Sequence, residues 1–225
     1  MYKLKRFFKE ILILKLLIHI YRNLSCKGKT LFFKYNWRKL NNHNQTSVSK
    51  IFKKGIVQVG NNSYGEINVF SWHSENEGLN IGHCVSISEG VKFILGGNHH
   101  TGGFTTFPFK SIARVFEPNL DASSKGVIEI GDDTWVGTDS IILSGVKIGR
   151  GCVIAAGSIV TKSFPNYSVI GGNPAKFIKF RLNDAEIKIA SKIKFEHIDI
   201  QNLSDEQIVS LYAKPTDETL NKFMS

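Results

Sequence analysis

Residues 130–162 read IGDDTW VGTDSI ILSGVK IGRGCV IAAGSI VTK when they are written in blocks of six. Each block opens with Ile or Val, and its fifth place holds a small or β-branched residue: Thr134, Ser140, Val146, Cys152 and Ser158. A period of six matches neither the turn of an α-helix nor the two-residue alternation of an ordinary strand. The repeat therefore predicts a β-helix, in which three short strands form each turn.

The same period is present upstream, but it is interrupted once. Blocks open at Ile81 and Ile87, Phe93 follows in register, and the pattern ends at Gly96-Gly97. It resumes at Val127, after roughly thirty residues without the period. A long insertion inside a compact repeat domain is usually functional. This one contains NHHTGGFTTFPF (98–109), with two adjacent histidines.

Positive charge is concentrated at the N-terminus. Residues 1–54 hold 14 of the 29 Lys and Arg residues, and Glu10 is the one acid among them. Such an arm suits an anionic surface, either a membrane or a nucleic acid. No nucleic-acid-binding motif is present, so a membrane is favoured and no nucleic acid is expected. We divide the chain into a basic helical arm (1–54), a β-helix domain (55–182, with its loop at 97–126) and a helical segment (183–225).

Residues 3–22 predict a basic, strongly apolar helix that is too short and too charged to cross a bilayer. The segment also lacks the features of a signal peptide. Two interpretations remain open: an interfacial helix that lies on a membrane through residues 1–22, or a helix that packs on the β-helix or on a partner subunit. Residues 23–54 are expected to form an extended lead-in. The expected location is cytoplasmic, peripheral at the inner face of the membrane if the helix binds lipid.

The C-terminal segment carries two helix-start signals. Asn183 with Glu186, and Ser204 with Gln207, each fit a capping box. We expect these helices to cap or brace the open end of the β-helix, because terminal repeats need cover. The three cysteines have no paired spacing, which favours a reducing compartment and gives no support to a metal site.

Three segments resemble the left-handed β-helix, hexapeptide-repeat acyltransferases: GGNHHTGGFTTFPF (96–109), GDDTWVGTDSIILSGVKIG (131–149) and AAGSIVTKSFPNYSVIGGNPAKFI (155–178). Within that family the chain is similar to the xenobiotic acetyltransferase branch, which includes chloramphenicol and streptogramin acetyltransferases and polysaccharide O-acetyltransferases. The resemblance covers about residues 56–182 and implies a mainly β fold, a left-handed parallel β-helix with a protruding active-site loop. The predicted N-terminal basic helix and C-terminal helices lie on either side of it. The resemblance also implies a homotrimer with active sites between subunits, acetyl-CoA as donor, and no required metal.

The resemblance also assigns roles to individual residues. The family's general base matches His99, and a neutral imidazole can take the proton of an attacking hydroxyl. The acceptor side is assigned to Tyr64, Asn98, His100 and Phe104. Relatives often carry Arg where this chain has His100. They also often carry Arg where this chain has Lys176 and Lys179, the last two residues assigned to the donor. The residues assigned to acetyl-CoA are Thr138, Ala156, Thr161, Lys162, Lys176 and Lys179.

These features predict an O-acetyltransferase acting on a sugar hydroxyl of a surface polysaccharide (capsule or lipopolysaccharide O-antigen) or its lipid-linked precursor. The basic arm favours this carbohydrate acceptor, because a lipid-linked sugar lies at the membrane. One alternative is an antibiotic (streptogramin or chloramphenicol) O-acetyltransferase. An alternative of another class is a non-catalytic β-helix scaffold, which His99 and the donor motif oppose. The sequence identifies neither the acceptor nor the hydroxyl.

Overall fold

The structure is a computed structural model that describes residues 24–113 and 121–224. The chain forms two compact units, one ending at Leu40 and one running from Asn41 to the C-terminus. The helix predicted over residues 3–22 lies outside the described residues. In the described ranges, no helix combines the length and the apolar character that crossing a membrane requires.

The extended lead-in predicted over residues 23–54 was wrong for residues 24–40, which are helical. The less exposed side chains of this helix include Thr30, Phe33 and Trp37, at spacings of three and four. Such spacing marks one helix face. The face escapes a hydrophobic pattern search because only two of these three residues are apolar. Residues 41–54 belong to the second unit, where β1 (Gln45–Val48) pairs with β3 (Tyr64–Phe70).

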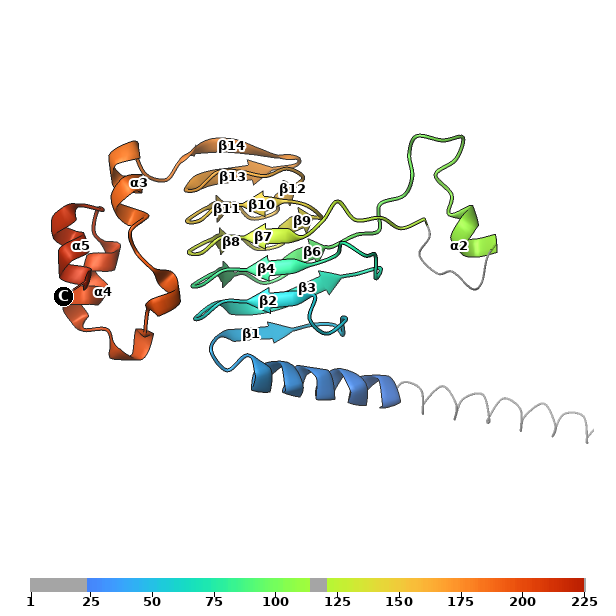
Figure 1. Cartoon of the computed structure of the whole chain (residues 1–225), viewed down its shortest axis with the longest axis horizontal. Helices are drawn as coiled ribbons and strands as arrows, with labels where there is room; N and C mark the ends of the chain where they lie inside the picture. The colour runs from blue at the N-terminus through green and yellow to red at the C-terminus, as the bar shows by residue number, and fades with distance from the viewer. Residues whose placement is uncertain (1–23, 114–120, 225) are drawn as a thin grey trace, which may run out of the picture. The chain divides into compact units, whose positions relative to one another are not determined.

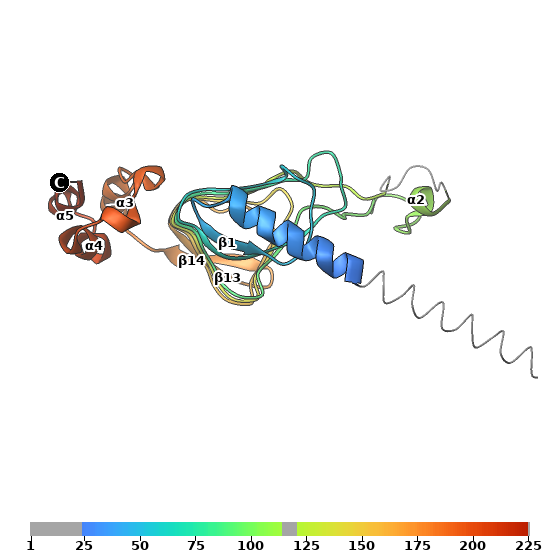
Figure 2. The same ribbon diagram turned by 90° about the horizontal axis from the view of Figure 1, so that it is seen from below.

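The second unit is a stack of coils built from short parallel strands (Figures 1 and 2). One face of the prism contains β2-β4-β7-β10, a second β3-β5-β8-β11, and a third β3-β6-β9-β12, so the long β3 serves two faces. The strands are β2 (Val57–Val59), β3 (Tyr64–Phe70), β4 (Leu79–Ile81), β5 (Ser86–Ile87), β6 (Lys92–Ile94), β7 (Ile128–Ile130), β8 (Trp135–Val136), β9 (Ile141–Leu143), β10 (Lys147–Ile148), β11 (Val153–Ile154) and β12 (Ile159–Val160).

The strand register confirms the six-residue period. Trp135 pairs with Val153, and Ile141 pairs with Ile159, so each residue meets the one 18 positions later, after three blocks of six. The residues that open the blocks are at most 3% exposed: Ile130, Val136, Ile142, Ile148, Ile154 and Val160. The fifth-position residues are at most 2% exposed: Thr134, Ser140, Val146, Cys152 and Ser158. Both sets form the core that the repeat predicts.

Buried hydroxyl groups and glycines fit the close spacing between coils. The Ser140 hydroxyl donates to the Ala155 carbonyl of the next coil at 3.2 Å, which satisfies a polar group that water cannot reach. A Cβ at Gly131 would lie 2.5 Å from the backbone nitrogen of Arg150. A glycine is therefore needed at this second place of a block, because the neighbouring backbone occupies the space of a side chain.

The last coil is covered by a hairpin. β13 (Ser168–Gly172) continues the stack in parallel with β11, and β14 (Ala175–Phe180) returns antiparallel along β13. The Asn173–Pro174 peptide bond between them is cis. The part of the prediction in which the C-terminal helices cap this end was therefore wrong, because backbone pairing with β14 already covers it.

The C-terminal helices are instead fixed along one edge of the prism. The side-chain amides of Asn61 and Asn62 donate to the carbonyls of Glu196 and Ile198, both at 2.9 Å. The guanidinium group of Arg150 donates to backbone carbonyls in the same segment. These contacts link coils early and late in the stack to the segment that follows α3 (Asp184–Ala190).

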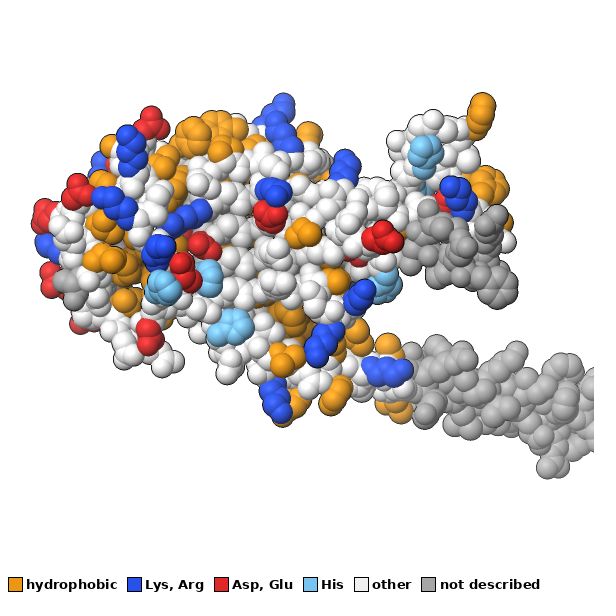
Figure 3. Space-filling model, in the orientation of Figure 1, with side chains coloured by type: hydrophobic (Ala, Val, Ile, Leu, Met, Phe, Trp, Pro, Cys, Tyr) orange, Lys and Arg blue, Asp and Glu red, His pale blue; other side chains and the backbone are white. Residues whose placement is uncertain are grey.

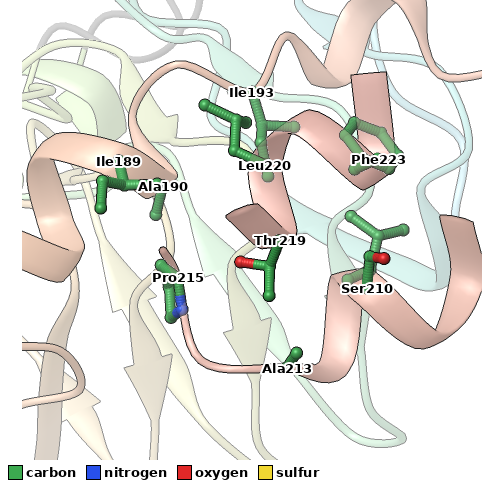
Figure 4. Close-up of a pocket in the computed structure, with 10 residues that line it drawn as sticks. Ile189, Ala190, Ile193, Ser210, Ala213, Pro215, Thr219, Leu220 and Phe223 are labelled. Carbon is green, nitrogen blue, oxygen red and sulfur yellow. The ribbon is translucent and has the colours of Figure 1, made fainter. Parts of the chain in front are cut away.

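Both predicted capping boxes are confirmed. They begin α3 (Asp184–Ala190) and α4 (Asp205–Tyr212), with Asn183 and Ser204 as the capping residues. Together with α5 (Asp217–Met224) these helices surround a small crevice of about 40 Å³ (Figure 4). Its apolar lining residues include Ile189, Ile193, Pro215, Leu220 and Phe223.

Candidate active site

The inserted loop leaves the prism after β6 and returns at β7, at the edge between two faces. Leu79 pairs with Ile128, so 49 positions separate partners that an uninterrupted repeat would place 18 apart. The insertion projects away from the stack and carries α2 (Phe109–Ala113) far from it (Figure 1). All the loop residues assigned to the site, Asn98 to Phe104, lie on its outgoing side.

The base of the loop is fixed to the next coil. Asn98 and Ser123 pair antiparallel, with backbone N–H to carbonyl distances of 3.0 and 2.9 Å. The hydroxyl of Ser144 accepts hydrogen bonds from the Asn98 side-chain amide at 3.2 Å and from the Lys125 backbone at 3.3 Å. Both strands of the loop therefore attach to one residue of the repeat. Asn98, assigned above to the acceptor side, uses its amide nitrogen in these bonds.

The His99 side chain is exposed, and the loop itself orients it. Its Nδ1 lies 2.8 Å from the backbone carbonyl oxygen of Thr106. A carbonyl oxygen can only accept a hydrogen bond, so Nδ1 must carry a proton. The neutral imidazole then presents Nε2 as an unprotonated acceptor, which is the form that a general base requires.

The other residues assigned to the acceptor side lie in two places. His100 is exposed near the following glycines: a Cβ at Gly103 would be 3.3 Å from its ring. Phe104 is fully exposed on the same loop. Tyr64, which is 52% exposed, lies instead on β3 beside Gln45 and Ser86. The loop thus gathers His100 and Phe104 near His99, whereas Tyr64 belongs to a strand face.

The residues assigned to acetyl-CoA occupy three surfaces. Thr138 and Ala156 are exposed at equivalent places in successive coils, where the Gly157 backbone donates to the Thr138 carbonyl at 2.7 Å. Thr161 and Lys162 follow β12 at the prism edge from which the loop emerges. In one chain, therefore, Thr138 and Ala156 lie on a different edge of the prism from the loop of His99.

The two remaining donor residues, Lys176 and Lys179, are exposed on the terminal strand β14. Their neighbours Phe177, Ile178 and Phe180 are 45%, 59% and 48% exposed. Figure 3 shows hydrophobic side chains gathered over this end of the stack. The strand thus combines positive charge with apolar surface.

The cysteines of the β-helix do not supply a nucleophile. Burial raises the pKa of the Cys152 thiol, and burial also raises that of Cys84, so both stay protonated near neutral pH. The Cys152 sulfur donates to the Pro165 carbonyl at 3.1 Å. Among residues 24–113 and 121–224, no three His, Cys, Asp or Glu side chains are grouped in a way that could hold a metal ion.

A turn that the sequence analysis missed also contacts the loop. Residues 71–78 join β3 to β4, and they touch both strands of the loop base through Trp72 and Ser74. The departure from the six-residue period between Phe70 and Leu79 indicates an irregular turn, but it does not indicate that the turn contacts the loop.

Comparison with known proteins extends this description. The family model described as "Bacterial transferase hexapeptide (six repeats)" matches residues 128–162. A probable macrolide acetyltransferase of Lysinibacillus sphaericus is 39% identical over 150 residues, which is 64% of this chain and 83% of that protein. Protein CapG of Staphylococcus aureus is 41% identical over 152 residues, 67% of this chain and 77% of that protein.

A chloramphenicol acetyltransferase of Klebsiella aerogenes is 40% identical over 122 residues, 52% of this chain. The match spans 58% of that enzyme's length. The repeat, the inserted loop and these similarities lead to one assignment: the chain belongs to the family of hexapeptide-repeat acetyltransferases.

Proposed function

We propose that the protein transfers the acetyl group of acetyl-CoA to a sugar hydroxyl of a surface polysaccharide, capsule or lipopolysaccharide O-antigen, or of its lipid-linked precursor. The observation that carries the proposal is the hydrogen bond from His99 Nδ1 to the Thr106 carbonyl, because it leaves Nε2 free to accept a proton. Family membership supports acetyl transfer, and the basic N-terminal arm supports an acceptor at the membrane.

In the proposed reaction, His99 Nε2 takes the proton of the sugar hydroxyl as its oxygen attacks the thioester carbon. The tetrahedral intermediate carries one negative charge on the former carbonyl oxygen, which a backbone N–H would stabilise. Collapse of this intermediate breaks the carbon–sulfur bond. The imidazolium of His99 then returns the proton to the departing CoA sulfur, which leaves an acetyl ester and CoA thiol.

The donor site is proposed to lie between two chains of a homotrimer with left-handed coils. Thr138 and Ala156 would line the pantetheine arm, with Thr161 and Lys162 further along it. Lys176 and Lys179 would bind the nucleotide phosphates as point charges. The separation of Thr138 and Ala156 from the loop of His99 supports a shared site, because a neighbouring chain could bring the two together.

A membrane role for the arm rests on its charge. An apolar helix at the headgroup boundary, with basic residues that each add about 1 kcal/mol on an anionic leaflet, binds reversibly. We expect the protein to bind anionic liposomes less well as salt is added, and the variant lacking residues 1–22 not to bind at all. If that variant is unfolded or no longer trimeric, the helix has a structural role instead.

Antibiotic O-acetylation is the second candidate, favoured by the similarity to a probable macrolide acetyltransferase and a chloramphenicol acetyltransferase. Mass spectrometry of surface glycan from cells with and without the gene separates the two. Loss of acetyl groups supports the glycan acceptor. An unchanged glycan, together with CoA release on adding chloramphenicol or a macrolide, supports the antibiotic. The absence of CoA release with every acceptor tested would favour the scaffold alternative.

A further inference from the structure

The turn at residues 71–78 lies on the same prism edge as the inserted loop that carries His99, one coil earlier. It joins the end of β3 to the start of β4, and the loop joins the end of β6 to the start of β7. Because β3 pairs with β6 and β4 pairs with β7, the two connections are stacked on each other. The turn is thus a direct neighbour of the loop base.

The turn is folded around one buried carboxylate. Glu77 is 9% exposed, and its two oxygens accept hydrogen bonds from the backbone N–H of Trp72 at 2.9 Å and of His73 at 3.1 Å. The Ser71 hydroxyl donates to the same carboxylate. His73 has a φ of 62°, a left-handed conformation that costs energy for a residue with a side chain. The carboxylate offsets this cost by binding the N–H of that residue.

The folded turn contacts both strands of the loop base. On the outgoing strand, a Cβ at Gly97 would lie 2.8 Å from the Trp72 ring, so the ring rests directly on this glycine. A Cβ at Gly96 would lie even closer to a carboxylate oxygen of Glu77. On the returning strand, the Ser74 hydroxyl donates to the carbonyl of Ala122 at 2.9 Å. Gly97 is two residues from His99.

We propose that Glu77 is a positioning residue for His99. It holds the 71–78 turn in the one shape that supports Gly96 and Gly97 from one side, while Ser144 holds the loop base from the other. This inference rests on the proposed function for the role of His99. A displacement of about 1 Å in a reacting group can lower a rate by a hundredfold, so a residue with no substrate contact can control turnover.

Three variants test this proposal: Glu77→Ala, Glu77→Gln and the control Glu75→Gln. Glu75 lies in the same turn, but its side chain is exposed. Glutamine at position 77 keeps an acceptor for the Trp72 N–H but places an amide donor against the His73 N–H. Each variant is assayed for thiol release from acetyl-CoA with purified surface glycan as acceptor, and for trypsin cleavage at Lys110 in the loop.

For Glu77→Ala we expect kcat to fall by about tenfold or more, because His99 loses its placement. The KM for acetyl-CoA should stay within about twofold, since the coil residues assigned to the donor are untouched. Cleavage at Lys110 should be faster, with an unchanged circular dichroism spectrum of the β-helix. The kcat and the cleavage rate of Glu77→Gln should lie between those of Glu77→Ala and the wild type. Both quantities should match the wild type in Glu75→Gln.

A second variant of the turn tests the proposal independently of Glu77. If Glu77→Ala does not fold, Ser74→Ala removes only the bond to Ala122 and should still speed cleavage at Lys110. Unchanged cleavage and unchanged kcat in every folded variant of this turn would overturn the proposal. If the wild type transfers no acetyl group while cleavage is faster in Glu77→Ala, the proposed function is wrong. The faster cleavage would still show that Glu77 positions the loop.

Discussion

The Nδ1 atom of His99 and the carbonyl oxygen of Thr106, seven residues apart in one loop, lie 2.8 Å from each other. The bond closes the segment between them and fixes the protonated nitrogen of the ring. The histidine thus needs no carboxylate partner to select its tautomer, because a backbone carbonyl does so.

The variant His99→Asn tests the role of the general base without changing the geometry of the loop. The Asn side-chain nitrogen can take approximately the place of Nδ1 and keep the bond to Thr106, but it cannot accept a proton. We expect kcat to fall by at least about a hundredfold, the usual scale for losing a general base. Acetyl-CoA affinity, measured by calorimetry, should be nearly unchanged. His100→Asn is the neighbouring control and should be milder; near-normal turnover in the His99 variant would rule out the proposed mechanism.

Ala156 tests the proposed path of the donor. It is exposed at the same place in its coil as Thr138 in the previous one. In Ala156→Phe a bulky ring would occupy the space next to the backbone that a pantetheine arm needs. We expect a KM for acetyl-CoA raised by about tenfold or more, with an unchanged melting temperature. Ala156→Ser keeps the residue small and should behave as the wild type. Equal KM values in all three proteins would place the donor elsewhere.

Ile142 tests the core of the repeat. It is fully buried between Phe93 and Val160 of the adjacent coils. Ile142→Ala should lower the free energy of unfolding by about 2–5 kcal/mol, because the stacked coils cannot close around the cavity. Ile141→Ala in the same strand is the matched control, since Ile141 points outward and is only partly buried. Urea denaturation followed by circular dichroism measures both variants. Equal losses in the free energy of unfolding would show that the inward and outward positions of this strand contribute equally to stability.

The residues that open each block could be identified from the sequence because every one of them meets the same environment. Ile130, Val136 and Ile142 each point into the prism, so a single periodic rule covers them and their 18-residue partners. The same holds for the capping boxes at Asn183 and Ser204, which depend on residues only three positions apart. These are local or strictly periodic constraints.

Other features depend on contacts that no period encodes. The turn built on Glu77 meets the loop through single contacts between non-repeating segments, and its sequence resembles any polar connection. Arg150 looks like an ordinary surface residue until its bonds to the segment after α3 are seen. The loop histidine was identified by resemblance, but its bond to Thr106 depends on how the loop folds back, which the motif letters do not specify.

Asp133 leads to a prediction about pH. Its φ of 54° is left-handed, a conformation that Asn also tolerates, and its Oδ2 lies 2.7 Å from Nη2 of Arg181. Burial raises the pKa of the Asp133 carboxyl, and the attraction of Arg181 opposes this only in part. The folded state therefore holds the proton more tightly than the unfolded state does. Stability consequently falls as pH rises from the ordinary Asp value of 3.8 through the raised one, and the full penalty persists at neutral pH.

In Asp133→Asn this penalty is absent at every pH. We expect the melting temperature of the variant to equal or exceed that of the wild type at pH 7, and its advantage to shrink as the pH is lowered below the ordinary Asp range. Asp139→Asn controls for removing a charge at another left-handed residue, with a φ of 57° and an exposed side chain. Scanning calorimetry between pH 3 and pH 8 measures all three proteins. A melting temperature for Asp133→Asn below that of the wild type at pH 7 would mean that the ion pair with Arg181 outweighs the cost of burying the carboxylate.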